Sequence, residues 1–121
     1  MAFWTFYYAD NGKVNNEIDF ELFGDNDIIY SAWTSETEST NLHRKTDFTI
    51  HDNEYHTYRF DWYAGDRVEF YIDNKLVETI TTNVPTEPMK VWIGAWCPTW
   101  SGEPTAGNFT MTVKSFKYTA F

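Results

Sequence analysis

The sequence predicts an all-β protein, built as an antiparallel β-sandwich or jelly roll. Segments of alternating or β-branched and aromatic residues recur along the 121 residues, and turn residues separate them. Helical periodicity is nearly absent, and no connection has the length of a helical crossover. The length is that of one domain, and no repeat or linker interrupts it, so we expect a single domain over residues 1–121.

The first part of the chain contains three predicted strands, at residues 3–9, 16–23 and 28–34. The runs at 10–12 and 24–27, rich in Asp, Asn and Gly, are turn signals between them. Residues 35–45 are polar and predict a loop. Residues 46–50 are a candidate short strand.

The clearest predicted element is a hairpin of residues 55–63 and 67–73, around the turn Ala64-Gly65-Asp66. Apolar and polar residues alternate in both arms, and Trp62 and Phe70 are expected in the core. A second turn at 73–75 leads into a strand at 76–81. Residues 89–96 are more continuously apolar, which predicts a strand covered on both faces. A Pro- and Gly-containing loop at 97–107 precedes a last predicted strand at 108–118.

Composition and charge narrow the choice of partners. Aromatic residues make up 20% of the chain, more than packing needs, and stacking on sugar rings is one use of such an excess. The net charge of −9 would repel phosphate, so nucleic acid and anionic membranes are excluded as favoured partners. Neutral polysaccharide fits this balance better. Cys97 is the single cysteine, so no internal disulfide forms, and neither a membrane-spanning run nor a signal peptide pattern is found.

Three acids, Glu17, Asp19 and Glu21, alternate with apolar residues in the second predicted strand. Alternation places the acids on one face of the strand and the apolar side chains on the other. Retaining glycosidases hold two carboxyls about 5–5.5 Å apart, one as nucleophile and one as acid/base. A third acid between them can hold the charge state of its neighbours, and crowding should raise at least one pKa.

The same alternation also fits an ordinary polar face turned to solvent, and on the pattern alone this is the better interpretation. Two features speak against it. Three acids on one strand face repel each other and disfavour a sheet. The strand also lies in a chain that is unusually rich in aromatic residues.

The motif Asn-Glu-Ile-Asp-Phe-Glu-Leu-Phe-Gly at 16–24 closely resembles the signature strand of glycoside hydrolase family 16. Residues 56–77, 88–100 and 108–118 resemble further segments of that family, in the same order. The resemblance implies a jelly roll that cleaves β-glucans with retention of configuration. It assigns Glu17 as nucleophile, Asp19 as assisting acid and Glu21 as acid/base. No extra residue precedes the last Glu, which resembles the lichenase-like branch and implies β-1,3-1,4-glucan, or else β-1,3-glucan, as substrate.

The resemblance also implies sugar-stacking roles for five aromatic residues, namely Trp4, Phe6, Trp33, Trp96 and Trp100. Core packing is the alternative for each of them. His56 is expected to be structural. No cofactor is required and no metal takes part in the chemistry. Relatives often carry a structural calcium, but no acidic loop here specifies one. By the same resemblance we expect a secreted, extracellular protein.

Two departures from the family pattern matter. The chain begins just before the catalytic strand and so lacks the N-terminal strands of the family, and Ser31 stands where lichenase-like members tend to carry Asn. A shortened jelly roll has open strand edges, so we expect it either to rearrange its sheets into a compact small sandwich or to form a homodimer through those edges, and we favour the homodimer. Three alternatives to hydrolysis stay open: a non-catalytic β-glucan-binding domain, a truncated or engineered fragment without activity, and a transglycosylase acting on β-glucan.

Overall fold

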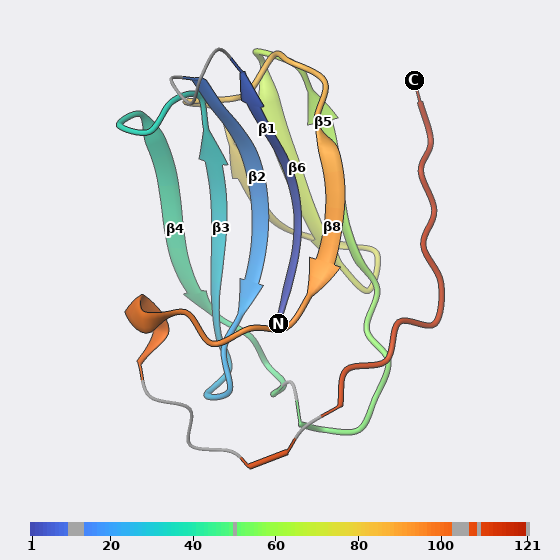
Figure 1. The fold of residues 1–121 in the computed structure, drawn as a ribbon. Helices are drawn as coiled ribbons and strands as arrows, with labels where there is room; N and C mark the ends of the chain where they lie inside the picture. The colour runs from blue at the N-terminus through green and yellow to red at the C-terminus, as the bar shows by residue number, and fades with distance from the viewer. Residues whose placement is uncertain (10–13, 50, 103–106, 109, 121) are drawn as a thin grey trace.

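The computed structural model describes residues 1–9, 14–49, 51–102, 107–108 and 110–120, and its described part is a sandwich of two antiparallel β-sheets (Figure 1). The predicted fold class is therefore confirmed. The single helical turn in the described part is the 3-10 helix η2 (Thr99–Ser101). No helix in the described residues has the length and apolar character needed to cross a membrane. The predicted turn at 10–12 lies outside the described residues.

The larger sheet has five strands in the order β4-β3-β2-β1-β8. These strands are β1 (Ala2–Ala9), β2 (Val14–Leu22), β3 (Asp27–Trp33), β4 (Ser39–Lys45) and β8 (Lys90–Gly94). All neighbours are antiparallel, and β2 lies at the centre. The strand that carries the three acids is thus hydrogen-bonded along both of its edges.

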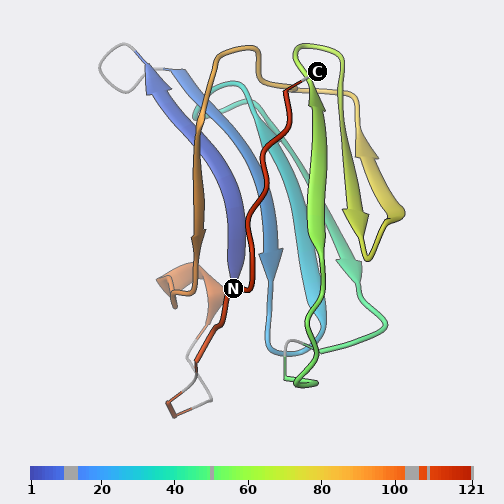
Figure 2. The ribbon, with the colours of Figure 1, turned by 90° about the vertical axis from the view of Figure 1, so that its right-hand side faces the viewer.

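The smaller sheet has three strands in the order β5-β6-β7, namely β5 (Tyr58–Tyr63), β6 (Arg67–Ile72) and β7 (Lys75–Ile80). Asp73 and Asn74 both adopt positive φ, 50° and 66°. This is the geometry of the two-residue hairpin turn that matches strand twist, and Asn and Asp tolerate it better than other non-glycine residues. Seen from the side, the two sheets form two layers (Figure 2).

The core lies between these layers. Alternate residues of β2 and β3 supply one side, and alternate residues of β6 with the end of β7 supply the other. The fully buried apolar side chains include Ile18, Phe20, Ile28, Val68, Phe70 and Ile80. Trp62 packs against this cluster, as expected, and its indole N–H donates to the Pro85 carbonyl at 2.9 Å. Because one face of β2 is committed to this core, its acids must lie on the other face.

The prediction of a loop at 35–45 was wrong, because residues 39–45 form β4. This strand is the outer edge of its sheet, and only Leu42 packs against the core. An edge strand of this kind can be polar on both faces, so its sequence lacks the alternation that marks a half-buried strand. The candidate short strand at 46–50 was also wrong, since the described residues 46–49 form no strand.

Two predictions about the C-terminal strands were also wrong. β8 is an edge strand rather than one covered on both faces: Val91, Trp92 and Ile93 are 40%, 49% and 39% exposed, because the core formed by the smaller sheet does not extend over it. Of the last predicted strand, the described residues 108 and 110–118 pair with no strand. Phe116 contacts Phe3 edge-on, with ring centroids 6.5 Å apart, but a side-chain contact does not replace the ladder of hydrogen bonds that makes a strand.

Candidate active site

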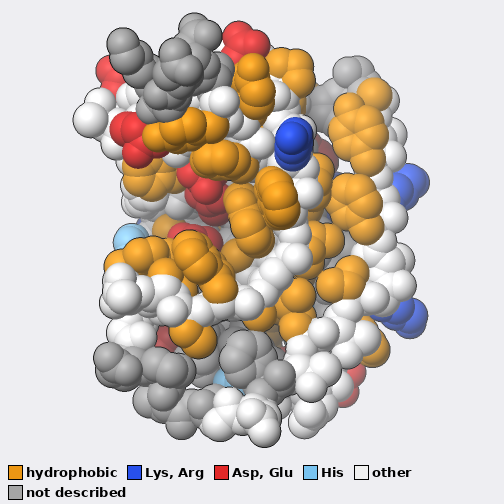
Figure 3. Space-filling model, in the orientation of Figure 1, with side chains coloured by type: hydrophobic (Ala, Val, Ile, Leu, Met, Phe, Trp, Pro, Cys, Tyr) orange, Lys and Arg blue, Asp and Glu red, His pale blue; other side chains and the backbone are white. Residues whose placement is uncertain are grey.

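The three acids of β2 share the face of the larger sheet that lies opposite the core. Glu17 pairs with Phe6 of β1 and Trp33 of β3, and Asp19 with Trp4 and Ser31. Paired residues of antiparallel strands point to the same side of a sheet, so these neighbours surround the acids. Figure 3 shows acidic atoms among hydrophobic side chains on this face.

Five surrounding residues and the three acids line one cavity of about 300 Å³. The lining is Ala2, Trp4, Phe6, Glu17, Asp19, Glu21, Trp92 and Trp96, of which Ala2 and Trp4 belong to β1 together with Phe6. The structure therefore brings together all three predicted acids and three of the five predicted aromatic residues. Of the other two, Trp33 lies beside Glu17 in the sheet, and Trp100 lies elsewhere.

Glu17 accepts a hydrogen bond from the Asn15 side-chain amide, with Nδ2 and Oε2 2.9 Å apart. Burial raises the pKa of Glu17, and the charge of Glu36 adds to this; the hydrogen bonds from Asn15 and Asp19 act in the opposite direction. The net pKa lies above its ordinary value. Two donors thus favour the ionised form of a carboxyl that burial alone would keep neutral.

Asp19 is the most buried of the three acids, at 6% exposure. Burial raises its pKa well above the ordinary value, and the charges of Glu17 and Glu21 raise it further. Its carboxyl shares a hydrogen bond with Glu17 and accepts one from Trp33. Since the pKa of Asp19 is raised while this bond lowers that of Glu17, the shared proton belongs to Asp19, which donates to Glu17.

Glu21 has a different environment from Glu17. Burial raises its pKa, and the negative charge of Glu17 raises it further. The positive charge of the Met1 amino group acts in the opposite direction, and no side-chain hydrogen bond favours the ionised form. A carboxyl of this kind retains its proton to higher pH and can donate it. The pKa values of both glutamates are therefore raised, but hydrogen bonds that favour the anion act on Glu17 and not on Glu21.

The aromatic residues of the cavity come from two neighbouring strands. Trp4 of β1 and Trp92 of β8 pair in register, and their rings are stacked with centroids 6.2 Å apart and an interplanar angle of 17°. Phe6 stacks in the same way on Tyr8, at 5.6 Å and 19°. Trp92 was missed by the sequence reasoning. Trp92 shares its face of the strand with Lys90 and Gly94, and this pattern would have placed it on the outer face. The prediction that β8 is covered on both faces hid this signal.

A second, larger cavity of about 780 Å³ continues from Glu21 and Trp96. It is lined in part by Phe23, His43, His51, Cys97 and Trp100. Trp100 is 57% exposed and meets Phe23 edge-on, with centroids 6.0 Å apart. Trp96 joins the two cavities, so Trp100 belongs to the extension beyond Glu21 and not to the space between the acids.

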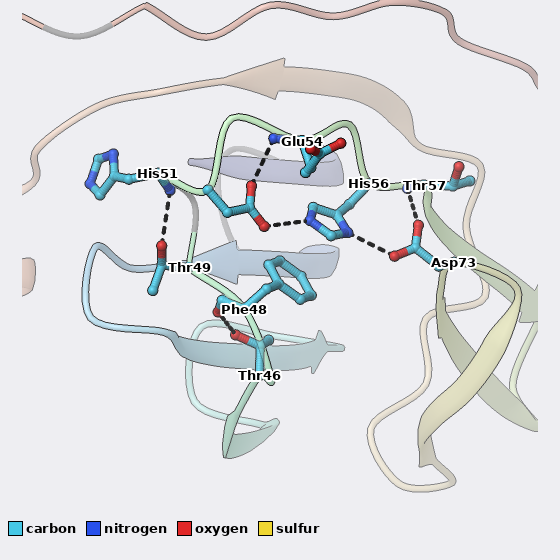
Figure 4. Close-up of polar contacts among 9 residues, drawn as sticks. Thr46, Phe48, Thr49, His51, Glu54, His56, Thr57 and Asp73 are labelled. Atoms are coloured by element: carbon cyan, nitrogen blue, oxygen red, sulfur yellow. Dashed lines mark hydrogen bonds and ion pairs between the residues drawn. The ribbon is translucent and has the colours of Figure 1, made fainter.

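His56 lines neither cavity. Its Nδ1 lies 2.7 Å from Asp73 and its Nε2 2.9 Å from Asp52, and its ring stacks on Phe48 with centroids 3.8 Å apart (Figure 4). Asp73 also accepts the backbone N–H of Thr57. These contacts tie the segment before β5 to the β6–β7 turn. The described residues contain no group of three or more His, Cys, Asp or Glu side chains placed to hold a metal ion.

Comparison with known proteins identifies the family of this chain. The family described as "Glycosyl hydrolases family 16" matches residues 1–115. The chain belongs to glycosyl hydrolase family 16. The curated "Beta-glucanase" of Paenibacillus polymyxa is 31% identical over 113 residues, which cover 88% of this chain and 47% of that protein. The "Beta-glucanase" of Bacillus licheniformis is 33% identical over 107 residues, 84% of this chain and 43% of that protein.

The fold comparison agrees with the family. The solved structure of the Bacillus licheniformis β-glucanase has a TM-score of 0.63 and 30% identity to this chain, and the match covers 84% of this chain and 49% of that one. The chain thus spans about half the length of the family 16 relatives it matches.

Proposed function

We propose that this chain is a retaining endo-β-glucanase that hydrolyses β-1,3-1,4-glucan, or β-1,3-glucan, by double displacement. The observation that carries the proposal is the contrast between Glu17 and Glu21 in one cavity. Burial raises the pKa of both, but Glu17 receives two hydrogen bonds that favour its anion and Glu21 receives none. The names of the β-glucanase relatives support a glucan as substrate.

In the first step, Glu21 protonates the glycosidic oxygen while the Glu17 carboxylate attacks the anomeric carbon. The carbon–oxygen bond to the leaving sugar breaks, and a covalent glycosyl ester of Glu17 forms. In the second step, Glu21, now ionised, takes a proton from water, and the water oxygen displaces Glu17 from the anomeric carbon. Two inversions at this carbon retain its configuration.

The middle acid has a supporting role in this proposal. Asp19 donates its proton to Glu17 and is itself held by Trp33. This hydrogen bond helps Glu17 leave in the second step, because it stabilises the carboxylate that is released. Trp4, Trp92 and Trp96 offer ring faces and edges to the sugars around the cleaved bond.

The test is the release of reducing sugar from barley mixed-linkage β-glucan, compared between the chain and its Glu17→Gln variant. We expect hydrolysis by the chain, and a loss of at least about 1,000-fold in the variant, which cannot form the ester. Equal release from both proteins would refute the nucleophilic role of Glu17. No release from either would refute hydrolysis by a chain of this length.

A second candidate function is glucan binding without turnover. It is favoured by the coverage of the comparisons, because the chain spans about half the length of these relatives. Retention on immobilised β-glucan by both the chain and Glu17→Gln, with no sugar released, would distinguish this function from hydrolysis.

We also propose that residues 1–121 form one family 16 domain, and that it forms a homodimer. No strand among the described residues pairs with the outer edge of β8, and this edge and the exposed side chains of Val91 and Ile93 support the assembly. We place the activity outside the cell, since a glucan polymer does not cross a bilayer; fractionation of the producing cells tests this location.

A further inference from the structure

We infer that Asn15 is a positioning residue for Glu17, and that its side-chain amide holds the carboxylate in place and in its ionised form. This inference rests on the proposed function, in which Glu17 is the nucleophile. Asn15 precedes the three acids on β2 and shares their face, because positions 15 and 17 are two apart on a strand. Its Nδ2 lies 2.9 Å from Oε2 of Glu17.

The burial of Asn15 indicates that this amide is more than a surface contact. Asn15 is 6% exposed, and its Oδ1 is a buried atom without a hydrogen-bond partner among the described residues. Leaving a buried carbonyl oxygen unpaired is unfavourable. A β-branched or aromatic residue would suit a central strand better. The structure therefore keeps an amide at this position at a cost to stability, and its one hydrogen bond in the described part of the chain goes to Glu17.

The chemistry of the contact makes it sensitive to the charge of Glu17. An ionised carboxylate only accepts hydrogen bonds, so the amide must turn its N–H towards Oε2. The opposite orientation would place two acceptor oxygens together. The contact consequently stabilises the anion and fixes the carboxylate against rotation, which are the two conditions for attack on an anomeric carbon.

The surroundings of Glu17 show why such support is needed. Two of the charged or titratable groups near Glu17 lie on its own strand, namely Asp19 and Glu21. The others on this face are Glu36 in the β3–β4 loop, Tyr8 on β1, and Lys90 on β8, which pairs in register with Phe6. Asp19 donates to Glu17, while burial and the charge of Glu36 disfavour its anion. Asn15 and Asp19 thus hold the carboxylate from two sides against burial and like charge.

The test measures the pKa of Glu17 directly, by carbon-13 NMR titration of the glutamate carboxyls. The Glu17 signal is assigned by its absence in Glu17→Gln. Asn15→Leu keeps the shape of the side chain and removes its donor, and we expect it to raise the pKa of Glu17 by about one unit. Asn16→Leu is the matched control, because Asn16 is also a buried amide on β2 and lies on the opposite face. It should leave the pKa of Glu17 within about 0.2 units of the wild-type value.

A pKa of Glu17 that stays unchanged in Asn15→Leu, or that moves equally in Asn16→Leu, would overturn the inference. Asn15→Asp, an isosteric change, decides the question if Asn15→Leu does not fold. Its added negative charge should raise the pKa of Glu17 further, and an unchanged pKa would again overturn the inference.

Kinetics on barley β-glucan provides the second readout. In Asn15→Leu the acid limb of the pH profile of kcat/KM should move up by the same amount as the NMR value, and kcat should fall about 10-fold with KM within a factor of about two. A fall in activity with an unmoved acid limb would show a structural role and overturn the positioning role. If the pKa shifts occur but no glucan is cleaved, the proposed hydrolysis fails while the contact between Asn15 and Glu17 stands.

Discussion

Burial and the charge of Glu17 raise the pKa of Glu21, and its proposed role as the acid can be tested through the leaving group. Glu21→Gln removes the proton donor but keeps the size of the side chain. We expect kcat on barley β-glucan to fall by about 10²–10⁴-fold, because a sugar alkoxide leaves poorly without protonation. On a glucan oligosaccharide with a dinitrophenyl leaving group, formation of the glycosyl ester should be nearly unaffected. Stopped-flow release of dinitrophenol measures this step, and equal losses on both substrates would contradict the role.

A substitution of Asp19 should change the stability and the activity of the chain in opposite directions. Burial raises its pKa well above the ordinary value, so the folded chain keeps a proton that the unfolded chain releases. Its contribution to stability is therefore complete below the unfolded pKa of about 3.9 and is lost as pH rises through the folded pKa. Asp19→Asn keeps both an acceptor for Trp33 and a donor for Glu17, and removes this loss. We expect its Tm at pH 8 to exceed that of the wild-type chain by about 5 °C, while activity falls.

Thermal unfolding of both proteins between pH 4 and pH 8, at roughly one-unit steps, measures this difference. Asp25→Asn is the control, since Asp25 is exposed in the β2–β3 turn. Parallel curves of Tm against pH for the wild-type chain and Asp19→Asn would contradict the prediction.

The residues of the site were predictable to different degrees. Alternation alone places Glu17, Asp19 and Glu21 on one face, because the apolar residues between them must enter the core. Nothing in the sequence marks Asn15, whose importance depends on a contact with a side chain two positions away. Trp92 was missed for a related reason: a continuous apolar run does not reveal which of its side chains face solvent.

At the level of elements, His56 links the segment before β5 to the β6–β7 turn. Burial lowers the pKa of His56, but the hydrogen bonds and charges of Asp73 and Asp52 outweigh this, so the net pKa is raised. The pKa values of both aspartates are lowered: their hydrogen bonds, that from His56 included, outweigh burial. The two hydrogen bonds between protonated His56 and the aspartates therefore stabilise the fold fully below the unfolded His pKa of about 6.5. This stabilisation is lost as pH rises through the folded pKa of His56. The stabilisation that comes from the lowered pKa values of the aspartates is lost as pH falls below about 4.

We expect His56→Gln to lower the free energy of unfolding by about 1–3 kcal/mol at pH 5–6, where both hydrogen bonds are charged, and by less at pH 9. Urea unfolding followed by tryptophan fluorescence at both pH values measures the change. His51→Gln is the matched control, because His51 is exposed and the contact drawn for it in Figure 4 uses its backbone N–H and not its ring. A loss of the same size at pH 5–6 and pH 9 would contradict an electrostatic role.

The elements that sequence reasoning placed correctly are those with one buried face, such as β2, β5 and β6, where the period of two is enforced by the core. The errors fall at the margins of the two sheets. β4 is polar because it is an edge, and β8 is exposed because no strand of the smaller sheet covers it. A strand's position within a sheet depends on its partners, and the sequence of a single strand does not encode them.

For the whole molecule, the exposed edge strand β8 is the reason to expect a homodimer. Val91 and Ile93 point to the core side of the sheet yet remain about 40% exposed, and Phe116, which contacts Phe3 of β1, is about half exposed. We expect the chain to be a dimer at micromolar concentration, and Ile93→Lys to shift it to a monomer, since a charge on this surface opposes its burial. Light scattering after size-exclusion chromatography measures the mass. Lys75→Ile, a change on β7 away from this edge strand, is the control, and a monomeric wild-type chain would refute the assembly.

The single cysteine, Cys97, is a site for selective chemical labelling. Cys97 is a free, exposed thiol, and it lines the larger cavity next to Trp96, on the Glu21 side of the three acids. A maleimide dye would therefore attach at one known position, without any engineered substitution. A dye attached there would report on the environment of the departing sugar rather than on that of the sugar held by Glu17. The signal of the dye could then be compared with the intrinsic fluorescence of the six tryptophans.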